Sequence, residues 1–316
     1  MPLAHDISGS GPAVILLHST VADRRMWDPQ MPALTAAGHR VIRCDLRGYG
    51  ESPITAGEDW DDADDVTALL DTLGITRTAV IASSGGGRVA LDLAARSPER
   101  VTALALLCTA LRGHEPSPAL RDFSDREDAL LEAGDVTAAT ELNVDLWLGP
   151  EAGEKELARV RRMQRNAFEV QLAADRAAAA LAADAATGPT AEPQAAPAAQ
   201  RTQQTPAAAA EQAGSPAAAE QAVVKQAGSP AAEQAAAEQA AAPAARAEAD
   251  LSVITAPALL VSGAHDLPDF REIAAHLATV LPKARHVELP WAGHLPSMER
   301  PDLLNPLLID FLAESR

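Results

Sequence analysis

Short runs of consecutive apolar residues alternate along the chain with longer segments in which apolar residues recur at helical spacing. Strands that are apolar on both faces and separated by helices are typical of a parallel sheet covered on both sides. The sequence therefore predicts an α/β protein with a mostly parallel sheet. The predicted strands are residues 13–17, 40–44, 78–82, 101–107, 258–262 and 284–289, and the predicted helices are 26–37, 62–73, 87–96, 270–281 and 302–313.

The alternation stops in the middle of the chain, where three helical segments follow one another without a strand. These segments are residues 124–131, 136–148 and 154–174. Gly134 and Asp135 form a suitable helix stop and N-cap between the first two. We therefore expect an all-helical cap, inserted before the last two strands.

Residues from about 187 to 249 are almost entirely Ala, Gln, Glu and Pro, and the segment 212–216 recurs as 226–230. This composition buries too little apolar surface to offset the entropy lost on folding. We expect the segment to be disordered or partly helical and to carry no catalytic residue. The predicted divisions are the first part of an α/β core at 1–111, a helical cap at 112–175, a low-complexity insert at 176–250 and the second part of the core at 251–316.

Acidic residues outnumber basic ones, 44 to 26, and give the 316-residue chain a formal net charge of −18. This excess argues against a nucleic-acid or anionic-membrane surface. Part of the acid lies in one run, residues 58–65, at the start of the predicted helix 62–73. A metal site is one interpretation of the run, but acids at a helix N-terminus are the simpler one. We expect neither a metal nor a cofactor.

The two cysteines, Cys44 and Cys108, lie in or at the ends of apolar strand-like runs. They indicate reduced, structural thiols rather than a disulfide framework.

The first residues lack the basic and apolar regions of a signal peptide, and no apolar run approaches the length of a membrane span. We expect a cytoplasmic protein, and the sequence leaves its oligomeric state open.

Ser84 lies in a loop of small residues, Ala82–Gly86, between a predicted strand and a predicted helix. A serine in so tight a turn, with very small residues two positions before and after it, is typical of a nucleophile elbow. Ser83 is the weaker candidate because the β-branched Ile81 would then flank it. A glycine-rich loop that cradles a phosphate is the alternative, and the turn alone does not decide between the two.

Two more residues of suitable chemistry follow later strands, namely Asp266 after 258–262 and His294 after 284–289. The carboxyl ends of parallel strands meet at one edge of the sheet, where such proteins bind ligands. The chain order Ser, Asp, His is the one expected for this sheet type. In such a triad the histidine takes the proton of the serine and the carboxylate orients the histidine.

Each assignment also has a simpler alternative. Asp266 could cap the following helix, His294 could be a surface histidine, and His265 competes with His294 as the base. His18 is interpreted as a structural hydrogen-bonding residue rather than a base. The joint placement of Ser84, Asp266 and His294 at strand ends, in the expected order, favours the triad.

Four segments together resemble the α/β-hydrolase superfamily, in its branch of small bacterial esterases, enol-lactonases and carbon–carbon bond hydrolases with a serine nucleophile. They are the strand end 16–19, the segment 45–52 of the form Asp-x-Arg-Gly-x-Gly-x-Ser, the acid loop 263–266 and the histidine loop 292–301. The resemblance implies an α/β-hydrolase fold for nearly everything except the low-complexity insert. The epoxide-hydrolase and dehalogenase branches are disfavoured, because they use a carboxylate where this chain has Ser84.

The resemblance also implies roles for individual residues. Ser84 resembles the nucleophile, Asp266 the triad acid and His294 the base, and the helices from about 115 to 175 resemble a lid. The implied oxyanion-hole donors are the backbone N–H groups of Thr20 and Gly85, with Ser19 as the alternative to Thr20. The implied pocket residues are Trp147, Met163 and Phe168, for some of which core packing is the alternative.

We therefore expect a cofactor-independent serine hydrolase that cleaves an ester, lactone or related acyl bond through an acyl-serine intermediate. The expected partner is a small, fairly apolar substrate. We expect the protein to bind neither nucleic acid nor a membrane. The alternative is a catalytically weak or inactive protein of the same fold that binds a small molecule, because Ser19 and Ala82 stand where the family usually has glycine. A third possibility is that the low-complexity segment is an interaction tether.

Overall fold

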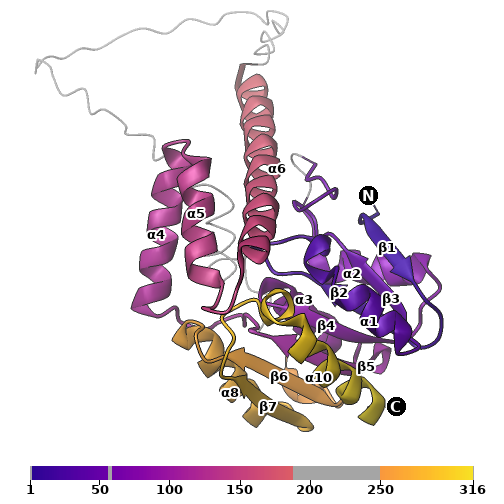
Figure 1. Ribbon diagram of the computed structural model, residues 1–316. Coiled ribbons are helices and arrows are strands. Elements are labelled where there is room, and N and C mark those ends of the chain that lie inside the picture. The colour runs from indigo at the N-terminus through magenta and orange to yellow at the C-terminus, as the bar shows by residue number, and fades with distance from the viewer. Residues whose placement is uncertain (1, 56–58, 188–249, 316) are drawn as a thin grey trace, which may run out of the picture.

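A seven-stranded, mostly parallel sheet forms the centre of the protein in a computed structural model that describes residues 2–55, 59–187 and 250–315 (Figure 1). The strand order is β1-β3-β2-β4-β5-β6-β7, and only the edge pair β1–β3 is antiparallel. The predicted α/β class is therefore confirmed. The strands are β1 (His5–Ser8), β2 (Ala13–Leu17), β3 (Arg40–Cys44), β4 (Thr78–Ser83), β5 (Val101–Leu107), β6 (Ala258–Gly263) and β7 (Ala284–Leu289).

Helices cover both faces of the sheet, because successive residues of each apolar strand point to opposite sides. Ile15 and Leu17 belong to a core cluster with α2, α3 and α8, whereas Val14 and Leu16 pack in a second cluster with α1 and α10. The helices of the core are α1 (Gln30–Ala36), α2 (Asp62–Thr72), α3 (Gly85–Arg96), α8 (Pro268–Val280), α9 (Pro296–Glu299) and α10 (Pro301–Glu314), with short 3₁₀ turns η1 (Arg24–Trp27), η2 (Pro98–Arg100) and η3 (Leu251–Val253).

The predicted helix 26–37 is wrong in one respect, since the structure divides it into η1 and α1. Pro29 lies at the division, and it has no N–H group to continue the helical hydrogen bonds.

The acidic run before α2 lies at a helix N-terminus, which is the simpler of its two interpretations. Asp61 caps the helix by accepting a hydrogen bond from the N–H of Asp64, and three acids occupy the first turn.

Three helices, α4 (Pro118–Glu132), α5 (Val136–Trp147) and α6 (Glu154–Thr187), connect β5 to β6 and stand together beside the sheet (Figure 1). We call them the lid. Gly134 has a positive φ and Asp135 caps α5, as the sequence predicts. Helix α4 begins earlier than predicted, because Ser117 caps it and Pro118 occupies its first turn. Helix α6 continues past the predicted end at 174, and most of the predicted low-complexity insert lies outside the described residues.

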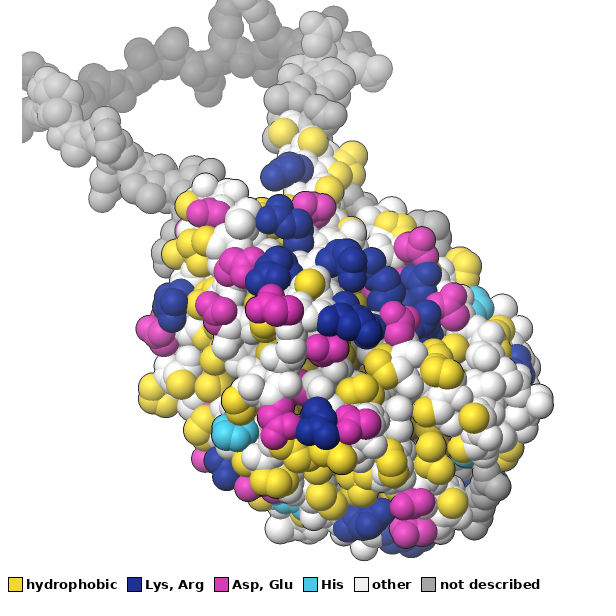
Figure 2. Space-filling model, in the orientation of Figure 1, with side chains coloured by type: hydrophobic (Ala, Val, Ile, Leu, Met, Phe, Trp, Pro, Cys, Tyr) yellow, Lys and Arg dark blue, Asp and Glu magenta, His cyan; other side chains and the backbone are white. Residues whose placement is uncertain are grey.

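The lid is attached to the core through polar contacts at its base. Arg159 of α6 donates hydrogen bonds to the carbonyl of Arg25 and to Asp28. Asp269 of α8 accepts a hydrogen bond of 2.7 Å from the N–H of Ser117, at the start of α4. Basic side chains gather around the base of α6 with acidic side chains between them (Figure 2). The described helices include none that is long and apolar enough to cross a membrane.

Candidate active site

Ser84 occupies the sharp turn between β4 and α3. Its φ of 52° is positive. Ser84 and Cys108 are the only non-glycine residues of the described chain with a positive φ. Such a conformation costs a side-chain-bearing residue about 1–3 kcal/mol and persists only where its surroundings enforce it. The surroundings here are backbone hydrogen bonds, because the N–H of Ser84 donates to Leu107 and its carbonyl accepts from Gly87 and Ala110. The turn predicted from small residues is therefore present and strained.

Two small residues allow the Ser84 turn to pack against the end of β2. A Cβ atom on Gly86 would lie 2.4 Å from the carbonyl oxygen of His18, so only glycine fits there. Ala82 is fully buried in β4, where it pairs with Leu17. The close approach places the first turn of α3 next to the loop after β2.

Asp266 and His294 form a buried pair at the ends of β6 and β7. His294 Nδ1 lies 2.8 Å from Asp266 Oδ2, and the side chains are 2% and 1% exposed. The other carboxylate oxygen, Oδ1, accepts from the N–H of Leu267, while α8 has no side-chain cap. His265 is exposed. Of the two neighbouring histidines, His294 is therefore the one that Asp266 orients.

Aromatic rings enclose the imidazole of His294 on two sides. The ring of Phe270 lies 4.2 Å from it between centroids, and the ring of Trp147 lies 4.6 Å from it. Trp147 comes from the lid and Phe270 from α8. The pair of Asp266 and His294 thus lies in an apolar setting in which water competes little for its hydrogen bond.

The Ser84 hydroxyl and the second ring nitrogen of His294 make no hydrogen bond to any of the residues that the structure describes. Ser84 is 5% exposed. Serine–histidine hydrogen bonds of active sites are often long before substrate binds. The structure therefore joins His294 to Asp266 but does not join Ser84 to His294 directly.

The loop after β2 and the start of α3 supply backbone N–H groups near Ser84. Gly85 is the first residue of α3, where N–H groups point out of the helix end and favour a negative charge. The N–H of Ser19 is already directed at Met26 Sδ, at 3.3 Å. Of the two candidate donors in that loop, the N–H of Ser19 therefore already has a partner, and Thr20 stays the predicted donor. Ser19 has no positive φ, so a serine there imposes no backbone strain.

The segment 45–52 shapes a loop rather than supplying reactive groups. Asp45 is buried and accepts hydrogen bonds from the N–H groups of Arg24 and Glu51. Gly50 has a positive φ, and a Cβ there would collide with the Asp45 carboxylate. His18 accepts from the N–H of Leu46 through Nε2, which makes it the structural residue expected.

Glu299 holds the loop that carries His294. It lies in the histidine loop segment 292–301, but the sequence alone does not indicate this role. Its two carboxylate oxygens accept the N–H groups of Gly293, at 2.9 Å, and Leu295, at 3.1 Å. These residues flank His294 on both sides. Burial raises the pKa of Glu299, and the backbone hydrogen bonds oppose that rise.

Cys108 lies between the serine turn and the buried pair, a placement that we did not predict. It directly follows β5, and its φ of 45° is positive. Its sulfur, an Asp266 oxygen and a His294 ring nitrogen all lie within 4.8 Å of one another. Burial raises the pKa of the Cys108 thiol well above its usual range, and a protonated thiol is a poor nucleophile and a poor metal ligand. The sequence places Cys108 at the end of an apolar run, but no signal in it indicates the neighbourhood of Asp266.

The three predicted pocket residues have different surroundings. Trp147 contacts His294, and Met163 packs in the same apolar cluster as Trp147. Phe168 instead packs with Leu131 and Ala139 in a separate cluster within the lid. The structure therefore brings Trp147 to the candidate site and places Phe168 in the lid core.

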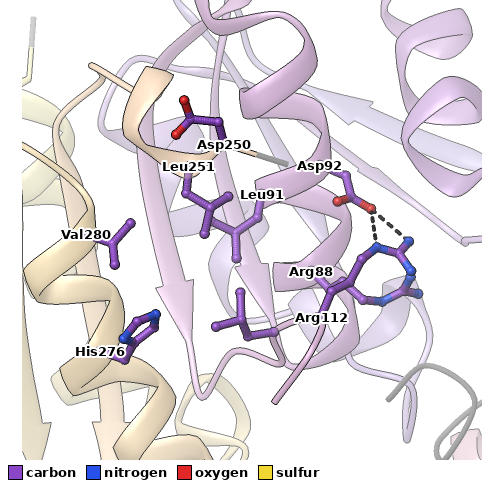
Figure 3. A pocket seen from close by; sticks show the side chains of 9 residues that line it. Arg88, Leu91, Asp92, Arg112, Asp250, Leu251, His276 and Val280 are labelled. Carbon is purple, nitrogen blue, oxygen red and sulfur yellow. Dashed lines mark hydrogen bonds and ion pairs between the residues drawn. The ribbon is translucent and has the colours of Figure 1, made fainter. Parts of the chain in front are cut away.

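A pocket of about 300 Å³ lies elsewhere, between α3, η3 and α8 (Figure 3). Arg112 and Asp92 in its wall are paired with each other by two hydrogen bonds. Ser84, Asp266 and His294 do not line it. The pocket is therefore separate from the candidate active site.

The protein has a strained serine between a strand and a helix, and a buried aspartate–histidine pair after later strands of the same sheet. This combination is typical of a hydrolase with an α/β fold. The alpha/beta hydrolase fold family matches residues 12–301. The chain belongs to this family, as the four sequence segments predict.

Comparisons with individual proteins agree with this membership. The chain is 38% identical over 112 residues to "Putative carbamate hydrolase RutD" of Variovorax paradoxus (strain S110), covering 34% of this chain and 42% of that protein. It is 36% identical over 115 residues to bifunctional epoxide hydrolase 2 of Sus scrofa, covering 34% of this chain and 20% of that protein. The matches thus span less than half the length of these relatives.

The solved structure of the enol-lactonase from Burkholderia xenovorans LB400 superposes with a TM-score of 0.67, covering 98% of this chain and 96% of that one. A thermophilic esterase from Thermogutta terrifontis has the same TM-score and covers 99% of this chain and 93% of that one. The sequence identities are 24% and 23%, so these likenesses show the fold alone.

Proposed function

We propose that the protein is a serine hydrolase that cleaves an ester, lactone or related acyl bond of a small, fairly apolar substrate. Ser84 is the proposed nucleophile, His294 the base and Asp266 the residue that orients the base. The observation that carries the proposal is the buried Asp266–His294 hydrogen bond at the same sheet edge as the strained Ser84 turn. A buried carboxylate on Nδ1 leaves Nε2 to exchange a proton with a hydroxyl.

The proposed reaction begins when Ser84 Oγ attacks the acyl carbon and its proton passes to His294 Nε2. Asp266 stabilises the resulting imidazolium through Nδ1–H. The negative charge on the former carbonyl oxygen meets the N–H groups of Gly85 and Thr20, and each such donor is typically worth about 3–4 kcal/mol. The proton on His294 then passes to the leaving group. Water, deprotonated by His294, hydrolyses the acyl-serine and restores the enzyme.

The apolar surroundings of His294 support a small, apolar acyl substrate. Phe270 and Trp147 contact its ring, and Phe123 of α4 packs edge-on against Trp147 at 5.0 Å. The lid thus presents aromatic surface to the site. The names of the structural neighbours, an esterase and an enol-lactonase, are consistent with acyl substrates.

The test compares two adjacent serines. We expect a fluorophosphonate probe to label Ser84, and Ser84→Ala to lower the hydrolysis of p-nitrophenyl acetate by at least about a thousandfold. Ser83→Ala is the matched control, because Ser83 is the adjacent buried serine, ends β4 and lies just before the strained turn. The proposal fails if the folded protein is not labelled at Ser84, or if both variants retain the wild-type rate.

A further inference from the structure

The end of lid helix α5 lies directly against the loop that carries His294. The N–H of His294 donates a hydrogen bond of 3.1 Å to the carbonyl of Trp147. Gly149, just after α5, packs so closely on Gly293 that a Cβ atom on Gly293 would lie 2.4 Å from the Gly149 nitrogen. The lid and the histidine loop are thus joined backbone to backbone.

The side chain of Trp147 adds a second hold on the same histidine. Its ring meets the imidazole at an interplanar angle of 44° and also packs edge-on against Phe270, with 5.7 Å between centroids. Phe270 meets the imidazole at 61°. The imidazole is therefore contacted by two aromatic rings and held at Nδ1 by a hydrogen bond to Asp266.

Buried polar groups in the lid fix the indole in turn. Trp147 Nε1 donates to Asn143 Oδ1 at 2.9 Å, and Asn143 Nδ2 donates to the Glu127 carboxylate of α4 and to the Ala139 carbonyl. Trp147, Asn143 and Glu127 are 5%, 1% and 3% exposed. A buried polar network contributes less to stability than apolar packing would, but it specifies one arrangement. An unbroken series of contacts therefore runs from α4 through α5 to His294.

We propose that Trp147 is a positioning residue that holds the His294 imidazole in its reactive orientation, with Asn143 and Glu127 holding the indole. The lid is then a working part of the catalytic apparatus as well as a cover. This inference rests on the proposed role of His294 as the base. A positioning residue acts on turnover, because a displacement of about 1 Å in a reacting group can cost about a hundredfold in rate.

The experiment uses the full-length protein with Trp147→Phe, which keeps an aromatic ring and loses the indole N–H, and Trp147→Leu, which loses the ring. Leu131→Ala is the control, because Leu131 is buried in the lid cluster that does not touch His294. We expect kcat for p-nitrophenyl acetate to fall in the order wild type, Phe, Leu, with a loss of at least about tenfold for Leu and KM within about twofold. Leu131→Ala should keep kcat within about twofold of wild type.

Two results would overturn the inference. A rise in KM at unchanged kcat would make Trp147 a substrate-contacting residue only. An equal fall in kcat for Leu131→Ala would assign the effect to general loosening of the lid. If Trp147→Leu does not fold, Trp147→Phe decides by the same split between kcat and KM.

A spectroscopic readout separates this inference from the proposed function. The proton between His294 Nδ1 and Asp266 should give a far-downfield ¹H NMR signal, identified by its loss in His294→Gln. We expect the Trp147 variants to shift or broaden this signal and Leu131→Ala to leave it in place. If the wild type hydrolyses no ester and Ser84 is not labelled, the proposed function fails. If the signal is unaltered in both Trp147 variants, the positioning role of Trp147 is wrong.

Discussion

The Nδ1 atom of His294 lies 2.8 Å from Oδ2 of Asp266, and both side chains are almost completely shielded from solvent. Asp266→Asn keeps the size of the side chain but places an amide where the carboxylate fixes the tautomer of the imidazole. We expect kcat/KM for p-nitrophenyl acetate to fall by about 10⁴ while the far-ultraviolet circular dichroism stays native. His265→Ala, at the exposed neighbouring position, should retain the wild-type rate. Comparable rates in Asp266→Asn and the wild type would remove Asp266 from the mechanism.

Glu299 provides a second test near the same histidine. Glu299→Gln replaces one of two accepting oxygens by an NH₂ group, which then faces a backbone N–H of Gly293 or Leu295. We expect a loss of about 1–3 kcal/mol in the free energy of unfolding, measured with urea, and a lower kcat. The control is Glu288→Gln, whose carboxylate pairs with Arg271 at the surface. A stability equal to that of the control would contradict the assigned role of Glu299.

Gly86 tests the packing of the Ser84 turn. Gly86→Ala would place a methyl group 2.4 Å from the His18 carbonyl oxygen, so the turn must move. We expect a loss of about 1–3 kcal/mol in stability and a larger loss of activity, because the displaced turn carries Ser84. In Gly153→Ala the added methyl meets only the flexible end of the Glu156 side chain, and the cost should stay below about 1 kcal/mol. Wild-type activity in Gly86→Ala would contradict the close packing.

Glu127 should make stability depend on pH. Burial raises its pKa from 4.5 to about 7. Between these values the folded protein holds a proton that the unfolded chain has released, so this contribution to stability falls as the pH rises from about 4.5 to 7. The full difference is about 3 kcal/mol.

Glu127→Gln keeps an oxygen that accepts from Asn143 and cannot ionise. We therefore expect the variant to match the wild type near pH 4.5 and to exceed its free energy of unfolding above pH 7, as measured by urea titration at both values. Glu132→Gln, at an exposed position of the same helix, should track the wild type at both pH values. A constant difference between Glu127→Gln and the wild type across this range would contradict the raised pKa.

The two cysteines should be chemically silent in the native protein. Cys44 and Cys108 are fully buried, and burial raises the pKa of both thiols. We expect no reaction with Ellman's reagent under native conditions and two reactive thiols in guanidinium chloride. Rapid native labelling of one thiol with loss of activity would show that Cys108 is accessible from the active site.

Much of the fold could be predicted because its determinants are local. The central strands are mainly apolar runs. The observed β3 (Arg40–Cys44), β5 (Val101–Leu107) and β7 (Ala284–Leu289) have the predicted bounds. The break at Pro29 was readable from proline chemistry but is missed by apolar periodicity alone. The division of the chain at 111, 175 and 250 stays a prediction.

Two features of the sequence predicted the candidate site: the positions of its residues just after strands, and their order along the chain. Contacts that do not follow from these two features were not predicted. Ser84, Asp266 and His294 each follow a strand, and the structure pairs the last two directly. The contact of Trp147 with His294 joins the lid to the histidine loop, and helical periodicity does not contain such a contact. Cys108 ends an apolar run, and its sequence gives no sign that it lies beside Asp266.

The pairing of β5 with β6 sets Leu107 beside Val261. In the sequence, the whole lid lies between these two residues. Pairing such distant segments costs loop-closure entropy and tends to slow folding, because the intervening chain must first give up its freedom. A growing polypeptide that has displayed the Ser84 turn therefore still lacks Asp266 and His294 until its last strands leave the ribosome. A fragment released before that point would carry the Ser84 turn without the Asp266–His294 pair.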